Sequence, residues 1–173
     1  VVERKGASGR SGNVPASKAV RLSEVEAQDA RRLVTGIGEF DRVLGGGIVA
    51  GGVTLLAGEP GIGKSTLLMQ TLAALSERNH AVLYVTGEES ASQVALRAQR
   101  IAGQALDDVH VVATTDVEDV RTAMEALHPD VVVVDSIQTM RAAIDSTPGS
   151  VTHLRVVAEE LVGLAKRGHI ALF

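Results

Sequence analysis

Residues 53–76 read V-T-L-L-A-G-E-P-G-I-G-K-S-T-L-L-M-Q-T-L-A-A-L-S, and the rest of the sequence can be interpreted around them. An apolar run at residues 53–57 predicts a strand, and the apolar periodicity after residue 65 predicts a helix. Between them, residues 58–65 match the pattern G-x-x-x-x-G-K-S/T. Strand, glycine-rich loop and helix in this order are the setting of a phosphate-binding loop, so we predict a site for a nucleoside triphosphate.

The residue types of this loop suit phosphate chemistry. Glycine lets the backbone turn tightly and bring its N–H groups close to phosphate oxygens. The helix that follows directs free N–H groups and the positive end of its dipole at the same place. Lys64 can reach the β- and γ-phosphates, and the Ser65 hydroxyl can ligate Mg²⁺. The predicted nucleotide-binding residues are Gly58, Glu59, Pro60, Gly61, Ile62, Gly63, Lys64, Ser65 and Thr66.

The composition limits the other functions open to the chain. Its 173 residues are enough for one domain with a full core, and its net charge of −4 argues against a nucleic-acid binder that is basic throughout. An aromatic content of 2% argues against an interface built on base stacking. The sequence has no cysteine, and its five histidines lack metal-ligand spacing. Because neither a membrane-spanning run nor a signal peptide is visible, we expect a cytoplasmic protein.

Strand and helix signals alternate along the chain. Residues 131–134 are four consecutive valines, which is typical of a strand buried on both faces of a parallel sheet. We therefore predict a three-layer α/β fold in which helices flank a mostly parallel sheet. Strands are expected at residues 53–57, 81–85, 109–113, 131–135 and 170–173. Helices are expected after the phosphate loop and at residues 22–30, 39–44, 90–102, 117–127 and 151–165, with Ser23 and Asp116 as caps of two of them.

Acidic residues follow two of the predicted strands at their carboxyl ends, where open parallel sheets bind ligands. Asp135 follows the valine run, in the position where phosphate-loop NTPases hold Mg²⁺ through water. Glu88 or Glu89 can orient and polarise the water that attacks the γ-phosphate. The same two residues also suit the N-terminus of the helix expected from Ser90, and spacing alone leaves both interpretations open. Gln138 is either a γ-phosphate ligand or an ordinary polar residue.

Four motifs together support a family resemblance. Residues 33–49 read L-V-T-G-I-G-E-F-D-R-V-L-G-G-G-I-V and resemble the segment that precedes the phosphate loop in the RecA superfamily. This segment is combined with G-E-P-G-I-G-K-S-T in the loop, Y-V-T-G-E-E-S at residues 84–90 and V-V-V-V-D-S-I-Q-T at residues 131–139. The combination resembles the bacterial RadA (Sms) family of that superfamily, and the resemblance extends from about Ser23 to Phe173.

The resemblance implies a RecA-like ATPase core that uses ATP and Mg²⁺ in homologous recombination and DNA repair. Family members resemble ring helicases and drive branch migration, which implies DNA, other copies of the chain and a recombinase as partners. By the family pattern, Glu88 matches the catalytic glutamate, Lys64 and Ser65 match the phosphate and Mg²⁺ residues, and Asp135 matches the acidic Mg²⁺ residue. Residues 141–152 lie where the superfamily has a DNA-facing loop.

The sequence also departs from the family pattern. The family's four-cysteine zinc module is absent from it, and so are the Lys-Asn-Arg-Phe-Gly motif and the Lon-protease-like domain expected after Phe173. We therefore expect a piece of a longer protein, with a flexible linker at residues 1–21 and the N-terminal part of the ATPase domain, truncated at its C-terminus, at residues 22–173. We also expect this piece to be a poor ATPase and of low stability by itself.

Two other functions stay open from the sequence. One is a different RecA-like ATPase, of the replicative-helicase or clock type, since the adjacent Glu88 and Glu89 also resemble clock-type ATPases. The other is an ATP-gated binding module for DNA or protein with little turnover.

Overall fold

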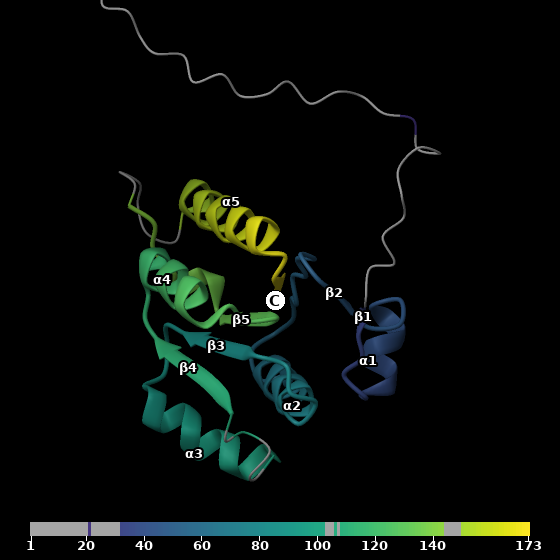
Figure 1. The fold of residues 1–173 in the computed structure, drawn as a ribbon. Coiled ribbons are helices and arrows are strands. Elements are labelled where there is room, and N and C mark those ends of the chain that lie inside the picture. Colours follow the sequence, from purple (N-terminus) through teal and green to yellow (C-terminus); the bar gives the residue numbers. More distant parts are fainter. Residues whose placement is uncertain (1–20, 22–31, 103–105, 107, 144–149) are drawn as a thin grey trace, which may run out of the picture.

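The computed structural model describes residues 21, 32–102, 106, 108–143 and 150–173 (Figure 1). The expected helix at residues 22–30 and, apart from Arg21, the expected linker lie outside these residues. So do residues 144–149 of the expected DNA-facing loop. In the described part of the chain, each helix is too short or too polar to cross a membrane.

Strands and helices alternate after the phosphate loop, as the sequence predicts. In chain order the elements are β1 (Arg32–Leu33), α1 (Gly38–Val43), β2 (Ile48–Val49), α2 (Lys64–Ser76), β3 (Val82–Thr86), α3 (Ala91–Ala102), β4 (Val109–Ala113), α4 (Val117–Leu127), β5 (Val131–Asp135), the 3₁₀ turn η3 (Ile137–Thr139), α5 (Val151–Gly168) and β6 (Ala171–Leu172). The expected cap of α4 is confirmed, because Asp116 Oδ1 accepts a hydrogen bond of 2.9 Å from the Glu118 amide. The small antiparallel sheet of β1 and β2 was not predicted.

The main sheet has the strand order β4-β3-β5-β6, and all its strand pairs are parallel. Because a helix follows each of β3, β4 and β5, the chain crosses over the sheet before each new strand, which produces parallel pairing. Helices α2 and α3 cover one face, and α4 and α5 cover the other (Figure 1). The predicted α/β fold with a parallel sheet between helices is thus confirmed.

The side chains of the central strands alternate between two cores. Val82 and Tyr84 pack with α2 and α3, whereas Leu83 and Val85 pack with α4 and α5. All residues of β3 are buried, and burying each large aliphatic side chain contributes about 1.5–3 kcal/mol. Two covered faces explain why these strands are apolar at consecutive positions instead of alternate ones.

The segment before the phosphate loop lies beside β6. The Leu172 amide donates to Gly52 O at 2.9 Å, and the Thr54 amide donates to Leu172 O at 2.8 Å. β6 therefore lies between β5 and this segment. Of the strand expected at residues 53–57, the structure has a single bridge, which joins Val53 to Leu172 in parallel.

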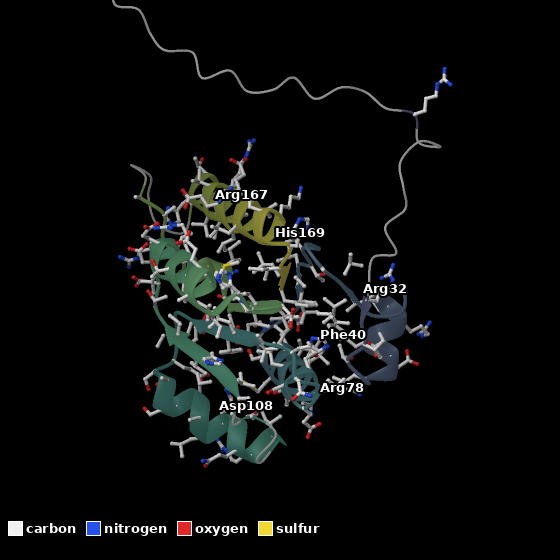
Figure 2. The ribbon with its side chains drawn as sticks, viewed as in Figure 1. Arg32, Phe40, Arg78, Asp108, Arg167 and His169 are labelled. Atoms are coloured by element: carbon white, nitrogen blue, oxygen red, sulfur yellow. The ribbon has the colours of Figure 1, made fainter. Side chains whose placement is uncertain are left out.

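The segment that contains α1 is attached to the end of α2. The buried Asp41 carboxylate accepts hydrogen bonds from the Thr35 amide (3.0 Å), the Thr35 hydroxyl (2.9 Å) and the Gly36 amide (2.9 Å). Arg78, after α2, donates to Thr35 O at 3.0 Å. The rings of Phe40 and Phe173 lie 5.8 Å apart, and Figure 2 labels Phe40 and Arg78 in this region. A single carboxylate thus organises the turn that joins α1 to the domain.

We predict that Asp41→Asn lowers the free energy of unfolding by about 1–3 kcal/mol, because it removes a charged acceptor from buried hydrogen bonds. Desolvation raises the pKa of Asp41, but hydrogen bonds from Thr35 and Gly36 and the charge of Arg78 outweigh it and hold this pKa below its ordinary value. Stability from a depressed carboxyl pKa is present above the pKa of the unfolded chain and is lost as the pH falls through the folded pKa.

Urea unfolding across the acid range measures this effect. The difference between the wild type and Asp41→Asn is expected to shrink as the pH falls, whereas the exposed Asp108→Asn control stays close to the wild type at every pH. A difference for Asp41→Asn that does not change with pH would contradict the role assigned to the carboxylate.

Candidate functional site

An exposed loop at residues 58–63 precedes α2. Gly61 and Gly63 have φ values of +80° and +101°, in the left-handed region that strongly favours glycine. A Cβ at either position would meet no heavy atom within 4 Å among those described, so backbone conformation rather than packing requires glycine. The glycines of the motif therefore set the path of the loop and leave space beside it.

The Lys64 side chain folds back over this loop. Its ammonium group donates to Gly58 O at 2.8 Å and to Glu59 O at 2.9 Å. Carbonyl oxygens are neutral acceptors, and phosphate oxygens bind an ammonium group more strongly because they are charged. Lys64 is thus held at the loop by bonds that a phosphate chain can replace.

The N-terminus of α2 differs from those of the other long helices. Asp116 caps α4, Ser150 caps α5, and the Ser90 and Gln93 side chains form reciprocal bonds at the start of α3. By contrast, the cap position of α2 is Gly63, which offers no side-chain acceptor, and the first turn has no acidic residue. The first N–H groups and the positive dipole end of α2 are therefore available to an anion, which fits a phosphate chain.

Glu88 and Glu89 diverge after β3. The Thr86 hydroxyl oxygen accepts hydrogen bonds from both of their amides, at 3.3 and 3.2 Å. Glu88 is exposed, and its Oε1 accepts a 3.1 Å bond from Ser136 Oγ, just beyond β5. Glu89 Oε2 instead accepts a 3.3 Å bond from Arg97 Nε on α3. Glu88 therefore lies toward the end of β5, whereas Glu89 is engaged in an ion pair.

Asp135 lies at the end of β5, directly opposite Thr86 of β3. The Tyr84 hydroxyl donates to Asp135 Oδ2 and accepts a 3.0 Å bond from Arg97 Nη2. Burial, followed by the hydrogen bond to Asp135, raises the pKa of Tyr84 well above its ordinary value of 10.0. The hydroxyl consequently stays protonated at physiological pH and remains a donor to Asp135.

A cavity of about 320 Å³ opens at this end of the sheet. Lys64, Asp135 and Ser136 line it beside apolar side chains of residues 53–56, β6 and α5. The structure thus brings the lysine of the phosphate loop and the acidic residue of β5 to one cavity. The remaining residues of the predicted set have these positions: Ser65 is half-buried at the start of α2, and Glu59, Pro60, Ile62, Thr66 and Gln138 are exposed.

Comparison with known proteins adds independent evidence. A family model described as an AAA domain matches residues 18–168. The chain belongs to the AAA domain family. The chain is similar to curated proteins named DNA repair protein RadA. It is 45% identical to the one from Mycobacterium tuberculosis (strain CDC 1551 / Oshkosh), 46% identical to the one from Bacillus subtilis (strain 168) and 43% identical to the one from Escherichia coli (strain K12). These matches cover 99%, 88% and 95% of the chain but only 36%, 33% and 36% of those relatives. The chain therefore spans about a third of the length of these curated relatives.

Sequence reasoning missed several residues of the AAA domain that contact the predicted site. Tyr84, Arg97 and Ser136 are bonded to its acidic groups. Tyr84 and Thr86 are two positions apart on β3, so their side chains face the same side of the sheet. This spacing could have indicated that Tyr84 lies on the same face as the end of the strand that leads to Glu88 and Glu89. The contact to Asp135 depends on the register between β3 and β5, which the sequence alone does not show.

Gly87 was also missed, and it determines how closely two loops approach. A Cβ at Gly87 would lie 2.2 Å from Thr139 Oγ1 and 2.7 Å from Thr139 Cβ. The turn that carries Glu88 therefore packs against η3 at a distance that only glycine permits. This contact joins the two strand ends that carry Glu88 and Asp135.

We predict that Gly87→Ala lowers the free energy of unfolding by about 1–3 kcal/mol, because the added methyl group overpacks the contact with Thr139. Gly38→Ala is the matched control, since a Cβ there meets no atom of the described residues within 4 Å, and we expect it to stay within about 0.5 kcal/mol of the wild type. Urea or thermal unfolding measures both variants. Equal stability of Gly87→Ala and Gly38→Ala would show that the two loops are not in close contact.

Proposed function

We propose that this AAA domain binds ATP with Mg²⁺ and hydrolyses the γ-phosphate bond. The observation that carries the proposal is the convergence of three features at one end of the sheet: the uncapped start of α2 with Lys64, the Asp135 carboxylate, and the exposed Glu88 carboxylate. The first binds anions, and the other two provide the carboxylates that metal-assisted phosphoryl transfer uses. The comparisons support this function through the AAA domain match.

Each residue has a distinct role in the proposal. Lys64 and the amides of the loop bind the phosphate chain and offset its charge. Ser65 and Asp135 would hold Mg²⁺, which supplies Lewis-acid stabilisation of charge on phosphate oxygens when it is bound. Glu88 acts as the base that orients the attacking water, with Ser136 Oγ holding one of its oxygens at 3.1 Å. Glu89 is excluded from that role in the proposal because Arg97 engages it.

For the whole protein we propose an ATPase of DNA repair and homologous recombination that processes or branch-migrates recombination intermediates. The support is the similarity, at 43–47% identity, to relatives that are named DNA repair protein RadA. The proposal includes a cytoplasmic ring of several copies, with DNA and a recombinase as partners. Residues 22–173 would belong to its RecA-like ATPase domain, residues 1–21 would form a linker, and the rest of the whole protein would carry the zinc module.

We predict that Lys64→Ala in the whole protein abolishes ATP binding, because it removes the cation that offsets the phosphate charge. Glu88→Gln is expected to keep ATP binding but to lower the hydrolysis rate by about 10²–10⁴-fold, the usual contribution of a general base. The matched control is Glu89→Gln, which changes the adjacent carboxylate in the same way and is expected to retain most of the activity. Filter binding of labelled ATP and phosphate release measure the two steps.

The outcomes separate the alternatives. Unchanged hydrolysis in Glu88→Gln, together with lost binding in Lys64→Ala, would contradict the role of Glu88. Negligible turnover of the wild type with intact ATP binding, with and without DNA, would favour the ATP-gated binding module. Failure of the wild type to extend branches on a synthetic three-strand junction in an ATP-dependent manner would contradict branch migration.

A further inference from the structure

A chain of polar contacts runs from α3 to the acidic end of β5. Arg97 Nη2 donates to the Tyr84 hydroxyl at 3.0 Å, and this hydroxyl donates to Asp135 Oδ2. The guanidinium carbon of Arg97 also lies 5.7 Å from the centre of the Tyr84 ring. Tyr84 has no exposed surface, and Arg97 is shielded, with 20% of its side chain exposed. These contacts therefore occur where water competes little.

The hydroxyl of Tyr84 bonds to a charged partner both as a donor and as an acceptor. A phenol has one hydrogen to donate, and here Asp135 receives it, while Arg97 donates to a lone pair of the oxygen. A hydroxyl that accepts from a cation becomes a stronger donor, because hydrogen bonds in a chain polarise one another. Arg97 therefore strengthens the hydrogen bond that Asp135 receives, by polarising the Tyr84 hydroxyl between them.

Packing alone does not account for this hydroxyl. The ring of Tyr84 lies in the core between the sheet and α2, beside residues such as Met69 and Leu72. A phenylalanine ring would bury the same apolar surface without placing a polar atom in the interior, which costs free energy unless the atom is bonded. Both partners of the hydroxyl lie beside the predicted site instead: Asp135 belongs to it, and Arg97 pairs with Glu89, the neighbour of Glu88.

We propose that Tyr84 and Arg97 are positioning residues for Mg²⁺: Arg97 orients the Tyr84 hydroxyl, and this hydroxyl holds the carboxylate of Asp135, the residue that would bind Mg²⁺, by its Oδ2. The inference rests on the proposed ATP site and adds two residues to it. Outer-sphere partners of this kind orient metal ligands, and their loss commonly costs 10–100-fold in metal affinity or activity. Neither Tyr84 nor Arg97 contacts the nucleotide in this arrangement.

The test uses the whole protein and the affinity of a fluorescent ATP analogue, measured with and without Mg²⁺. We expect Tyr84→Phe to lower the Mg²⁺-dependent gain in affinity by about 10-fold, while affinity without Mg²⁺ stays at the wild-type value. Arg97→Gln should also lower the Mg²⁺-dependent gain in affinity, whereas Arg97→Lys should keep part of this gain. Because Arg97 acts through Tyr84, the double variant should equal Tyr84→Phe alone.

Arg100→Gln is the matched control, since Arg100 lies on the same helix and donates to its own helix at Leu96 O. It should leave the Mg²⁺ dependence unchanged. Wild-type Mg²⁺ dependence in both Tyr84→Phe and Arg97→Gln, or additive effects in the double variant, would overturn the proposal. If Tyr84→Phe does not fold, Arg97→Gln alone tests the proposal, and wild-type Mg²⁺ dependence of that variant would overturn it. A Lys64→Ala protein that binds the analogue like the wild type would overturn the proposed ATP site itself, which is a distinct failure.

Discussion

The parallel pairing of β3 with β5 places Thr86 directly opposite Asp135. A slip of one residue would turn every side chain of β5 to the other face of the sheet and would remove Asp135 from Tyr84. Apolar pattern alone cannot prevent such a slip, because four consecutive valines suit either face. The hydrogen bond between Tyr84 and Asp135 is formed only in the observed register, so it both depends on the pairing and favours it.

From this register follows the separation of the two glutamates. Thr86 binds the amides of Glu88 and Glu89 and so fixes the turn after β3. Arg97 then engages Glu89, while Ser136, which follows Asp135, engages Glu88. Gly87 permits the turn to approach η3. The pairing of β3 with β5 thus places Glu88 at the end of β5 and Glu89 beside α3.

Sequence reasoning could predict the features that local chemistry determines. The phosphate loop, the cap at Asp116 and the buried valine strand each depend on residues close together in the chain, and the fold class follows from the alternation of strands and helices. The contacts of Tyr84, Arg97 and Ser136 could not be predicted, since they join residues that lie 8 to 51 positions apart. The strand expected at residues 53–57 is present only as the bridge between Val53 and Leu172, a pairing of residues that lie far apart in the sequence.

We propose that the phosphate loop, Asp135 and Glu88 form one site for ATP and Mg²⁺. A crystal structure of the whole protein with a non-hydrolysable ATP analogue and Mn²⁺, with the metal located by anomalous scattering, tests it most directly. We expect Ser65 Oγ to ligate the metal, Asp135 to contact it through water, and Glu88 to face the γ-phosphate. A metal distant from Ser65 and Asp135, or Glu89 in place of Glu88 at the γ-phosphate, would contradict it.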